Sequence, residues 1–376
     1  MDVGQGSKTS ETSLSSTPWL VRSPVESSDV SLAAAEDHVR YRSVAIEGMC
    51  HHLPDVVIET SAIEQMLSRT YERLHIPQGT LEAMTGVGAR RFCRPGVQPS
   101  DLATRAAEQL LEETGFDRSR IGVLVSTSVC KDYLEPSVAA LVHGNLGLPS
   151  SSLNFDVGNA CLGFMSGMSV VSNMIELGQI EAGLVVVGEG SRDVTLATAG
   201  RLQQNDATFE DFRGNLATLT LGSGSCAMLL VHERLSTMGH RVNGSTSLSA
   251  THHNRLCIGT ARSMQTDAPK LLAEGVELAR RNWTEARSSL NLQAEQVKSY
   301  ALHQVGRPNH EAVIAALEVP TERAIRLYPR LGNVGAAGVP LAMSESLQEG
   351  RFDIGDTVML MGIGSGLNTQ MMRVDW

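Results

Sequence analysis

Apolar runs and helical patterns alternate along most of the chain. Ile121–Ser128 and Ala182–Glu189 are nearly continuous apolar segments, which is typical of strands that are buried on both faces of a sheet. In Ser61–Leu74 the apolar residues recur at helical spacing instead, which predicts an amphipathic helix. Buried strands that alternate with helices favour the α/β class.

The same patterns predict further elements on either side of these segments. Pro99–Leu111 is predicted to be a long helix with Ser100 as its N-cap. Arg201–Arg213 is polar and irregular, and we expect a surface or lid insertion there. The other predicted strands are Val44–Met49, Cys226–Val231, Ser299–Gln304 and Val358–Met361, and the other predicted helices are Thr80–Thr85, Leu271–Trp283, His310–Leu317 and Ala336–Gln348.

Two parts of the chain repeat the same order of elements. A buried strand, a Gly-Asn pair, a small-residue helix that ends at glycine and a second strand occur around Gly158-Asn159 and again around Gly332-Asn333. The helix-ending glycines, Gly178 and Gly350, are separated by nearly the same number of residues as the two Gly-Asn pairs. This repeat predicts two similar α/β halves with one shared core, residues 41–235 and 236–376.

Composition narrows the class of protein. Hydrophobic residues make up 42% of the 376 residues, with 35 glycines and 4% aromatic residues, which suits an α/β core of small aliphatic side chains. The net charge of −10 argues against nucleic acid as a partner. Residues 1–40 are rich in Ser and Thr and lack the apolar core of a targeting peptide, so we expect a disordered tail. No apolar run is long enough to predict a transmembrane segment.

The cysteines and histidines do not form a recognisable metal or disulfide pattern. The six cysteines include no CxxC pair, and no His/Asp/Glu cluster has metal-ligand spacing. We therefore expect no metal, no disulfide framework and a cytoplasmic location.

One cysteine lies where a nucleophile would be activated. Cys161 follows the short apolar segment that ends at Gly158-Asn159 and precedes a small-residue helix. The free N–H groups and the dipole of a helix N-terminus favour a thiolate, so we expect an activated nucleophile. A single cysteine in an apolar segment is more often an inert core residue, and the rest of the site has to decide between the two interpretations.

The repeat brings two more residues to the same place. If the halves are pseudosymmetric, the helix start at Asn333 faces the helix start at Cys161, and His303 lies at the end of a strand that converges on them. Taken singly, His303 would be a buried histidine and Asn333 a turn residue. Together with Cys161 they predict a thiol nucleophile with two donors for a developing oxyanion.

The segments around these residues resemble a known family. Asn159–Phe164, His303–Pro308 and Gly332–Pro340 are similar to the Cys-His-Asn motifs of ketosynthase-III-like enzymes of the thiolase superfamily. Gly362–Asn368 resembles the glycine-rich loop of that family. The resemblance covers about residues 41–376, and it implies a thiolase fold, with two pseudosymmetric α/β halves in a layered αβαβα arrangement.

A subgroup of that family is the most similar. Ser126–Val129, Asp132–Ser137 and the closing Trp376 resemble the OleA-type acyl-CoA condensing enzymes. The resemblance implies a cofactor-free, homodimeric acyltransferase with fatty acyl-CoA substrates. It would perform a non-decarboxylative, head-to-head Claisen condensation of two long-chain acyl-CoAs to a 2-alkyl-3-oxo fatty acid. This reaction is the first step of long-chain olefin biosynthesis, so downstream pathway enzymes are possible partners.

The resemblance also implies a role for each site residue. Cys161 would accept the first acyl group, with its own N–H and that of Ser365 as the oxyanion hole. His303 and Asn333 would hold the second thioester carbonyl and stabilise its enolate. Glu135 would reach the neighbouring subunit's site and remove the α-carbon proton, which decarboxylative enzymes do not need to remove. The alternative for Glu135, which stands beside Lys131 and Asp132, is a solvated loop charge.

Two further functions stay open at this point. One is a decarboxylative 3-oxoacyl-[acyl-carrier-protein] synthase III, and the other is a non-catalytic scaffold that binds acyl chains. A degradative thiolase is disfavoured, because Ser365 stands where such an enzyme has a second cysteine. Arg90, Arg91 and Arg94, which we expect in a basic loop, would either contact CoA phosphates or form a solvated cluster. The tryptophan and arginine pattern that initiating ketosynthases use for CoA is absent.

Overall fold

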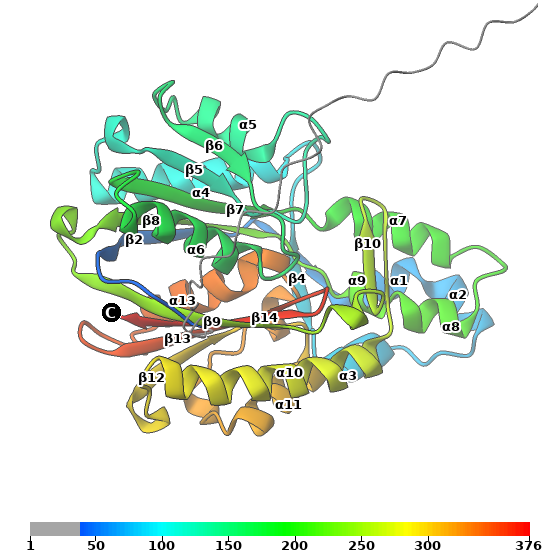
Figure 1. Cartoon of the computed structure of the whole chain (residues 1–376). Coiled ribbons are helices and arrows are strands. Elements are labelled where there is room, and N and C mark those ends of the chain that lie inside the picture. The colour runs from blue at the N-terminus through cyan, green and yellow to red at the C-terminus, as the bar shows by residue number, and fades with distance from the viewer. Residues whose placement is uncertain (1–37) are drawn as a thin grey trace, which may run out of the picture. The chain divides into compact units, whose positions relative to one another are not determined.

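The computed structural model describes residues 38–376, which contain one large sheet flanked by helices (Figure 1). The predicted tail, residues 1–40, lies outside the described residues except for its last three. These form β1 (His38–Arg40), which pairs with β9. No described helix is long and apolar enough to cross a membrane.

The strands of the large sheet form two runs that meet at β2 and β9. The order is β6-β5-β7-β8-β2 in the first run and β9-β14-β13-β12 in the second. The first run consists of β2 (Val44–His52), β5 (Val123–Ser126), β6 (Leu153–Asp156), β7 (Ala182–Glu189) and β8 (Gly224–His232). The second consists of β9 (His240–Ser249), β12 (Val297–Leu302), β13 (Thr357–Gly364) and β14 (Asn368–Asp375).

The two runs have the same topology, as the repeat in the sequence predicts. In the first, β5 pairs in parallel with β7, and β7 is antiparallel to β8. In the second, β12 pairs in parallel with β13, and β13 is antiparallel to β14. The counterpart of β6 is reduced to a single parallel bridge between Tyr300 and Ala324.

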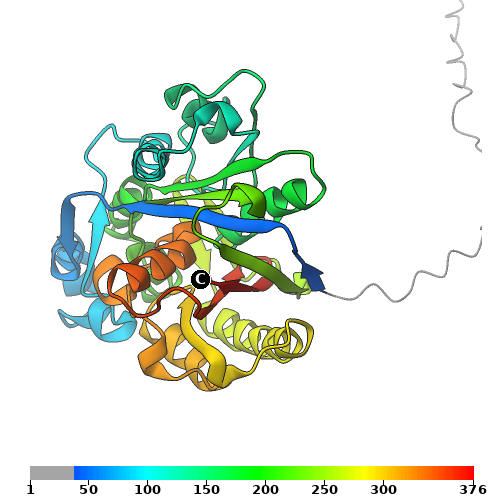
Figure 2. The same ribbon diagram turned by 90° about the vertical axis from the view of Figure 1, so that its left-hand side faces the viewer.

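Helices cover both outer faces and fill the space between the runs (Figure 1). α4 (Pro99–Thr114) and α5 (Val138–Asn145) pack on the first run, and α10 (Ala268–Ser289) and α11 (Arg307–Leu317) lie on the far side of the second. α6 (Gly163–Glu176) and α13 (Gly338–Gln348) lie in the middle. Figure 2 shows β2, in blue, between the green elements of the first half and the orange and red elements of the second.

The buried side chains confirm this layering. One cluster lies between the two runs and includes Phe164, Met168 and Leu341 from the middle helices. A second lies under α4 and α5, and a third under α10 and α11. Three apolar clusters separated by two sheet layers amount to an αβαβα arrangement, so the predicted fold class is confirmed.

Smaller elements lie outside the large sheet. They are the pair β3 (Val56–Glu59) and β4 (Ala89–Phe92), the pair β10 (Cys257–Thr260) and β11 (Ser263–Thr266), and the helices α1 (Thr60–Met66), α2 (Ser68–Arg73), α3 (Thr80–Thr85), α7 (Arg192–Leu202), α8 (Phe209–Gly214), α9 (Leu216–Leu219) and α12 (Tyr328–Leu331).

Three local features differ from the prediction. Only residues 203–208 of Arg201–Arg213 are irregular, because α7 extends to Leu202 and α8 begins at Phe209 after a capping box made by Thr208 and Asp211. The N-cap of α4 is Gln98, which forms a capping box with Asp101, and not Ser100. β9 and β14 were not predicted as strands.

Candidate active site

Cys161 lies in a tight turn between β6 and α6. The preceding Ala160 has a positive φ of 45°, and α6 begins two residues later at Gly163. A Cβ at Gly163 would come within 2.6 Å of the Thr127 carbonyl oxygen, so only glycine lets the helix start approach the end of β5 this closely. The sequence therefore places the thiol at the edge where parallel strands end, as predicted.

The expectation of a resting thiolate was wrong. Burial raises the pKa of the Cys161 thiol to about 12, and the negative charge of Glu189 adds to the rise. A helix N-terminus stabilises a nearby anion by only about 0.3–1 kcal/mol, whereas burial shifts a pKa by up to several units. Desolvation wins, so the resting nucleophile is a thiol that must lose its proton during the reaction.

His303 follows the end of β12 and is a neutral imidazole. Its side chain is buried, and burial lowers its pKa to about 4. Its Nδ1 atom has no hydrogen-bond partner among the described residues and faces the first turn of α13. A Cβ at Gly338 would lie 3.0 Å from this Nδ1, so the glycine makes room for the ring.

The orientation of Asn333 is fixed by its own turn. Gly332 has a φ of 66°, and a Cβ there would lie 2.2 Å from the Thr220 carbonyl oxygen. Asn333 N donates to that oxygen at 3.0 Å, and Asn333 Oδ1 accepts from Gly335 N at 3.0 Å. With Oδ1 engaged, the Nδ2 group of this buried side chain is the donor that is left for a ligand.

Ser365 lies in the glycine-rich segment, which is the turn of a hairpin between β13 and β14. A Cβ at Gly364 would come within 2.9 Å of the Asn159 carbonyl oxygen, so the hairpin turn packs directly on the turn that holds Cys161. Asn368 Nδ2 also donates to Asn159 Oδ1 at 3.1 Å.

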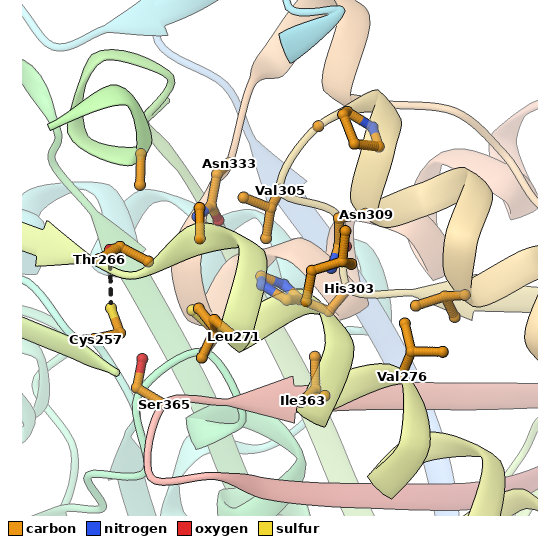
Figure 3. Close-up of a pocket in the computed structure, with 18 of the residues that line it drawn as sticks. Cys257, Thr266, Leu271, Val276, His303, Val305, Asn309, Asn333, Ile363 and Ser365 are labelled. Atoms are coloured by element: carbon orange, nitrogen blue, oxygen red, sulfur yellow. Dashed lines mark hydrogen bonds between the residues drawn. The ribbon is translucent and has the colours of Figure 1, made fainter. Parts of the chain in front are cut away.

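Four of the five predicted site residues line one cavity of about 500 Å³. They are Cys161, His303, Asn333 and Ser365. Figure 3 shows the last three together with Leu271 and Val276 of α10 and Ile363 of β13. The rest of the wall is mainly aliphatic and comes from α10, α11, β13 and β14. The site thus joins a thiol and two polar donors to a deep apolar chamber.

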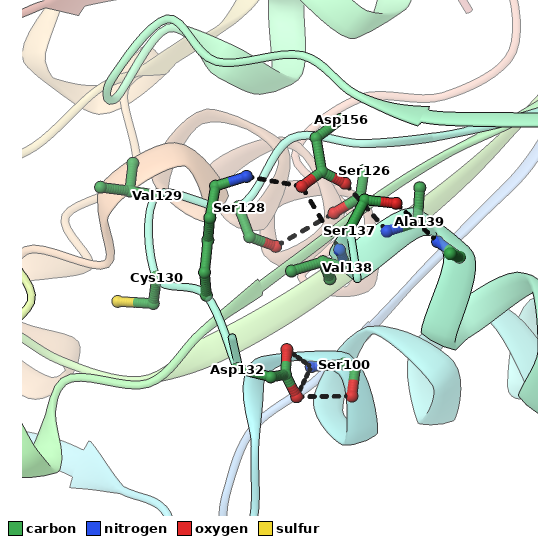
Figure 4. Close-up of polar contacts among 12 residues, drawn as sticks. Ser100, Ser126, Ser128, Val129, Cys130, Asp132, Ser137, Val138, Ala139 and Asp156 are labelled. Carbon is green, nitrogen blue, oxygen red and sulfur yellow. Dashed lines mark hydrogen bonds and ion pairs between the residues drawn. The ribbon is translucent and has the colours of Figure 1, made fainter. Parts of the chain in front are cut away.

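Glu135 does not lie at this cavity. It belongs to the loop between β5 and α5, whose tip is exposed, with Leu134 at 94% and Tyr133 at 57% exposure. The stem of the loop is held firmly (Figure 4). Asp132 accepts from Ser100 Oγ at 2.7 Å, and Lys131 Nζ lies 2.5 Å from Asp156 Oδ2.

The arginines are not arranged as expected. Arg90 and Arg91 lie on β4 and not in a loop, and Arg90 is completely buried. Its guanidinium donates to Thr60 Oγ1 at 2.9 Å and to the Leu219 carbonyl at 3.1 Å, so it holds the fold together and cannot meet a phosphate. Arg94 is exposed and lies 3.5 Å from Asp55.

Sequence reasoning missed two residues beside the nucleophile. Cys257 of β10 lines the cavity, and Thr266 Oγ1 donates to its sulfur at 3.4 Å. Glu189, the last residue of β7, is a fully buried carboxylate whose charge reaches Cys161. The sequence signal for Glu189 was a charged residue at the end of an apolar strand. Within residues 38–376, no group of His, Cys, Asp and Glu side chains could hold a metal ion.

Comparisons with known proteins identify the family and agree with the fold. Residues 288–376 match the family model described as 3-oxoacyl-[acyl-carrier-protein (ACP)] synthase III C terminal, and residues 155–200 match 3-oxoacyl-[acyl-carrier-protein (ACP)] synthase III. The chain is 38% identical to an acyl-CoA:acyl-CoA alkyltransferase of Xanthomonas campestris over 336 residues, which are 89% of this chain and 99% of that protein. It is also 38% identical to one of Shewanella oneidensis over 350 residues, 90% of this chain and 100% of that protein.

Solved structures of Xanthomonas campestris OleA have the same fold. The structure with bound cerulenin superposes with a TM-score of 0.87 at 38% identity and covers 90% of this chain and 98% of that one. A variant of that enzyme with a glutamate replaced by glutamine gives a TM-score of 0.88 and covers 91% and 99%. The predicted thiolase fold is therefore confirmed.

Proposed function

Because this chain belongs to the family of acyl-CoA:acyl-CoA alkyltransferases, we propose that it condenses two long-chain acyl-CoAs head to head without decarboxylation. The product is a 2-alkyl-3-oxo fatty acid, formed through an acyl-Cys161 intermediate. The observation that carries the proposal is that Cys161, His303, Asn333 and Ser365 line one apolar cavity of about 500 Å³. Such a chamber suits an alkyl chain, and these four residues place a thiol and polar groups in its wall, as a thioester requires.

The solved structures of the relative support the choice of residues. The structures of Xanthomonas campestris OleA include variants in which one cysteine, one glutamate or one histidine is replaced. These three residues are spaced along that chain as Glu135, Cys161 and His303 are spaced here. We therefore assign the acyl acceptor to Cys161, the base to Glu135 and a carbonyl donor to His303.

The first half-reaction is acyl transfer. The sulfur of Cys161 attacks the thioester carbonyl, the C–S bond to CoA breaks, and CoA leaves as a thiol. The proton that CoA gains is the one that Cys161 loses, and the neutral imidazole of His303 can relay it. The N–H groups of Cys161 and Ser365 stabilise the oxyanion, a role that the packing of the hairpin turn on the nucleophile turn supports.

The second half-reaction forms the carbon–carbon bond. Glu135 removes a proton from the α-carbon of the second acyl-CoA, while Asn333 Nδ2 and His303 donate hydrogen bonds to its carbonyl oxygen. The resulting carbanion attacks the acyl-Cys161 carbonyl and expels the Cys161 thiolate, which takes up a proton. Hydrolysis of the remaining thioester releases the second CoA and the acid. No step needs a cofactor.

The position of Glu135 supports a second subunit. The loop from Val129 to Pro136 ends away from its own cavity, with Leu134 and Tyr133 exposed at its tip, while its stem is held by Ser100, Asp156 and Glu189. A rigid loop with apolar side chains at its tip is suited to insertion into a neighbouring molecule. We therefore propose a homodimer in which each Glu135 serves the partner's site.

The matched family models favour a second candidate, a decarboxylative synthase III that uses a malonyl thioester on a carrier protein. In that reaction the loss of CO₂ produces the carbanion, so Glu135 has no role. The scaffold hypothesis is disfavoured, because a protein that only binds acyl chains has no use for a thiol, an imidazole and an amide in one cavity wall.

The experiment is incubation of the purified protein with myristoyl-CoA alone, followed by CoA release and mass spectrometry of the products. A coupled β-keto acid or ketone that is lost in Cys161→Ala and in Glu135→Gln supports the proposal. Free myristate only, with condensation appearing after malonyl-carrier protein is added, assigns the synthase III reaction. If Cys161 is not acylated under either condition, the scaffold function stands.

Two further expectations stay predictions: that this reaction is the first step of long-chain olefin biosynthesis, and that the protein is cytoplasmic.

A further inference from the structure

The carboxylate of Glu189 receives three backbone hydrogen bonds at the centre of the molecule. Its side chain extends from the end of β7 and is fully buried. Oε1 accepts from Val129 N at 3.0 Å and from Ala336 N at 3.1 Å, and Oε2 accepts from Cys130 N at 3.1 Å. All three donors are main-chain groups, two in the loop after β5 and one in the 3-10 turn Gly335–Ala337, so this carboxylate ties the two segments together.

The two loops that it joins carry different parts of the proposed machinery. Val129 and Cys130 lie in the loop between β5 and α5, a few residues before Glu135. Ala336 is three residues after Asn333, in the turn whose Gly335 N–H orients the Asn333 amide. Gly335 itself has a φ of 54°, and a Cβ there would lie 3.0 Å from Glu189 Oε1. One carboxylate therefore connects the Glu135 loop to the Asn333 turn.

We propose that Glu189 is a positioning residue for the condensation step, which holds the Asn333 turn of its own site and the stem of the Glu135 loop in a fixed relation. The inference rests on the proposed function. In the dimer that we propose, Glu135 acts in the partner's site, so Glu189 links the two sites through a single side chain. Its effect falls on the enolate-forming half-reaction, because Asn333 and Glu135 act there and not in acyl transfer.

The charge of Glu189 provides a second, independent readout. Three N–H donors stabilise the anion, although burial itself raises the Glu189 pKa. The anion in turn raises the pKa of the Cys161 thiol. Removal of the charge should therefore make Cys161 more acidic, an effect that a purely structural role would not produce.

The test separates the two half-reactions in Glu189→Gln. We expect acyl-Cys161, measured by intact-protein mass spectrometry, to form at a rate within about 3-fold of the parent protein. Turnover of the acylated enzyme to condensed product should fall about 100-fold with little change in KM, because a displacement of about 1 Å in a reacting group costs roughly that factor. The rate of Cys161 alkylation by iodoacetamide at about pH 8 should rise, since a lower pKa increases the thiolate fraction.

The matched control is Glu47→Gln. Glu47 is also a buried carboxylate, which accepts from Thr237 N at 3.0 Å and from Thr237 Oγ1, and it does not line the cavity. Its replacement should lower the unfolding midpoint without changing the ratio of condensation to acylation or the alkylation rate.

Glu189→Asp is the second variant, and it provides the test if the glutamine variant does not fold. It keeps the charge and shortens the reach, so alkylation should stay at the parent rate while condensation falls.

Two results would overturn the inference. One is unchanged condensation in Glu189→Gln or, where that variant does not fold, in Glu189→Asp. The other is an equal fall of acylation and condensation with unchanged alkylation, which would show only a smaller fraction of folded protein. A failure of the proposed function is distinguishable from both, because it would remove condensation in the parent protein and leave the alkylation difference in place.

Discussion

Asn368 Nδ2 donates a hydrogen bond to Asn159 Oδ1 at 3.1 Å, which ties the closing hairpin to the turn that presents Cys161. Asn159 Nδ2 in turn donates a hydrogen bond to Ser166 Oγ of α6 at 3.0 Å. The two turns come from opposite halves of the sequence, and the packing of Gly364 on Asn159 leaves no room for a side chain between them. The two proposed oxyanion donors, the N–H groups of Cys161 and Ser365, are held in register by this link.

Asn368→Ala should therefore slow acylation of Cys161 more than it destabilises the fold. Loss of one partly buried hydrogen bond costs about 1 kcal/mol of stability. A misplaced oxyanion donor costs up to about 100-fold in rate, and we expect a fall of at least about 10-fold in single-turnover acylation.

Ser249→Ala is the control for this prediction. Ser249 Oγ donates to the other end of the same amide, Asn368 Oδ1, at 2.7 Å on an exposed surface. Acylation in this variant should stay close to the parent rate. If both variants slow acylation equally, the link to Asn159 does not position the oxyanion donors.

Gly338→Ala should impair catalysis without loss of stability. Gly338 is the first residue of α13 and has helical dihedral angles, so alanine would stabilise the helix by up to about 1 kcal/mol. Its Cβ, however, would come within 3.0 Å of His303 Nδ1 and push the ring away. We expect an unchanged or higher urea midpoint and condensation reduced at least about 10-fold.

Gly144→Ala in α5 is the matched substitution. A Cβ there would contact nothing within 4 Å, so stability should rise by a similar amount with full activity. Full activity in Gly338→Ala as well would show that the position of His303 does not limit the reaction.

Gly275→Leu should shift the preference towards shorter acyl chains. Gly275 lies on α10 in the wall of the cavity, and a Cβ there would already be 3.0 Å from Ile363 Cδ1. A leucine adds about three further carbon atoms, which must fill part of the chamber. In a competition between decanoyl-CoA and palmitoyl-CoA, the ratio of shorter to longer incorporated chains should increase at least several-fold. An unchanged ratio would show that the alkyl chain does not occupy this part of the cavity.

The repeated units could be predicted because their strands are buried on both faces. β5, β7 and β8 consist almost entirely of apolar residues, and helices separate β5 and β7 from the next strand, so one pattern identifies both element types. β9 was missed because it carries Arg241, Asn243 and Ser245 in a strand whose polar groups find partners inside the protein. For example, Gln370 Nε2 donates to Ser245 Oγ at 3.2 Å.

The site residues that belong to sequence motifs could be predicted. Those whose role depends on contacts between distant parts of the chain could not. Cys161, His303, Asn333 and Ser365 each follow a strand or a glycine turn, and the topology brings these ends together. The role of Glu189 depends on partners at positions 129, 130 and 336, which no local pattern connects. The burial of Arg90 likewise depends on Leu219, far along the chain. The pKa of Cys161 depends on how much water the finished cavity excludes, which periodicity does not reveal.

Buried histidines should make the protein acid-sensitive, and His310 allows a clean test. Both of its ring nitrogens are buried without hydrogen-bond partners among the described residues, and burial lowers its pKa to about 4. The folded pKa lies below the ordinary value of about 6.5, so this stability is complete above about pH 6.5 and is lost as the pH falls towards 4. His310→Leu should therefore equal or exceed the parent in unfolding free energy at pH 7. Between pH 7 and 4.5 the unfolding free energy of His310→Leu, measured by urea denaturation, should fall by about 2 kcal/mol less than that of the parent protein. The carboxylates and His303 contribute equally to the loss in both proteins. An identical loss in the two proteins would show that folding does not lower the pKa of His310.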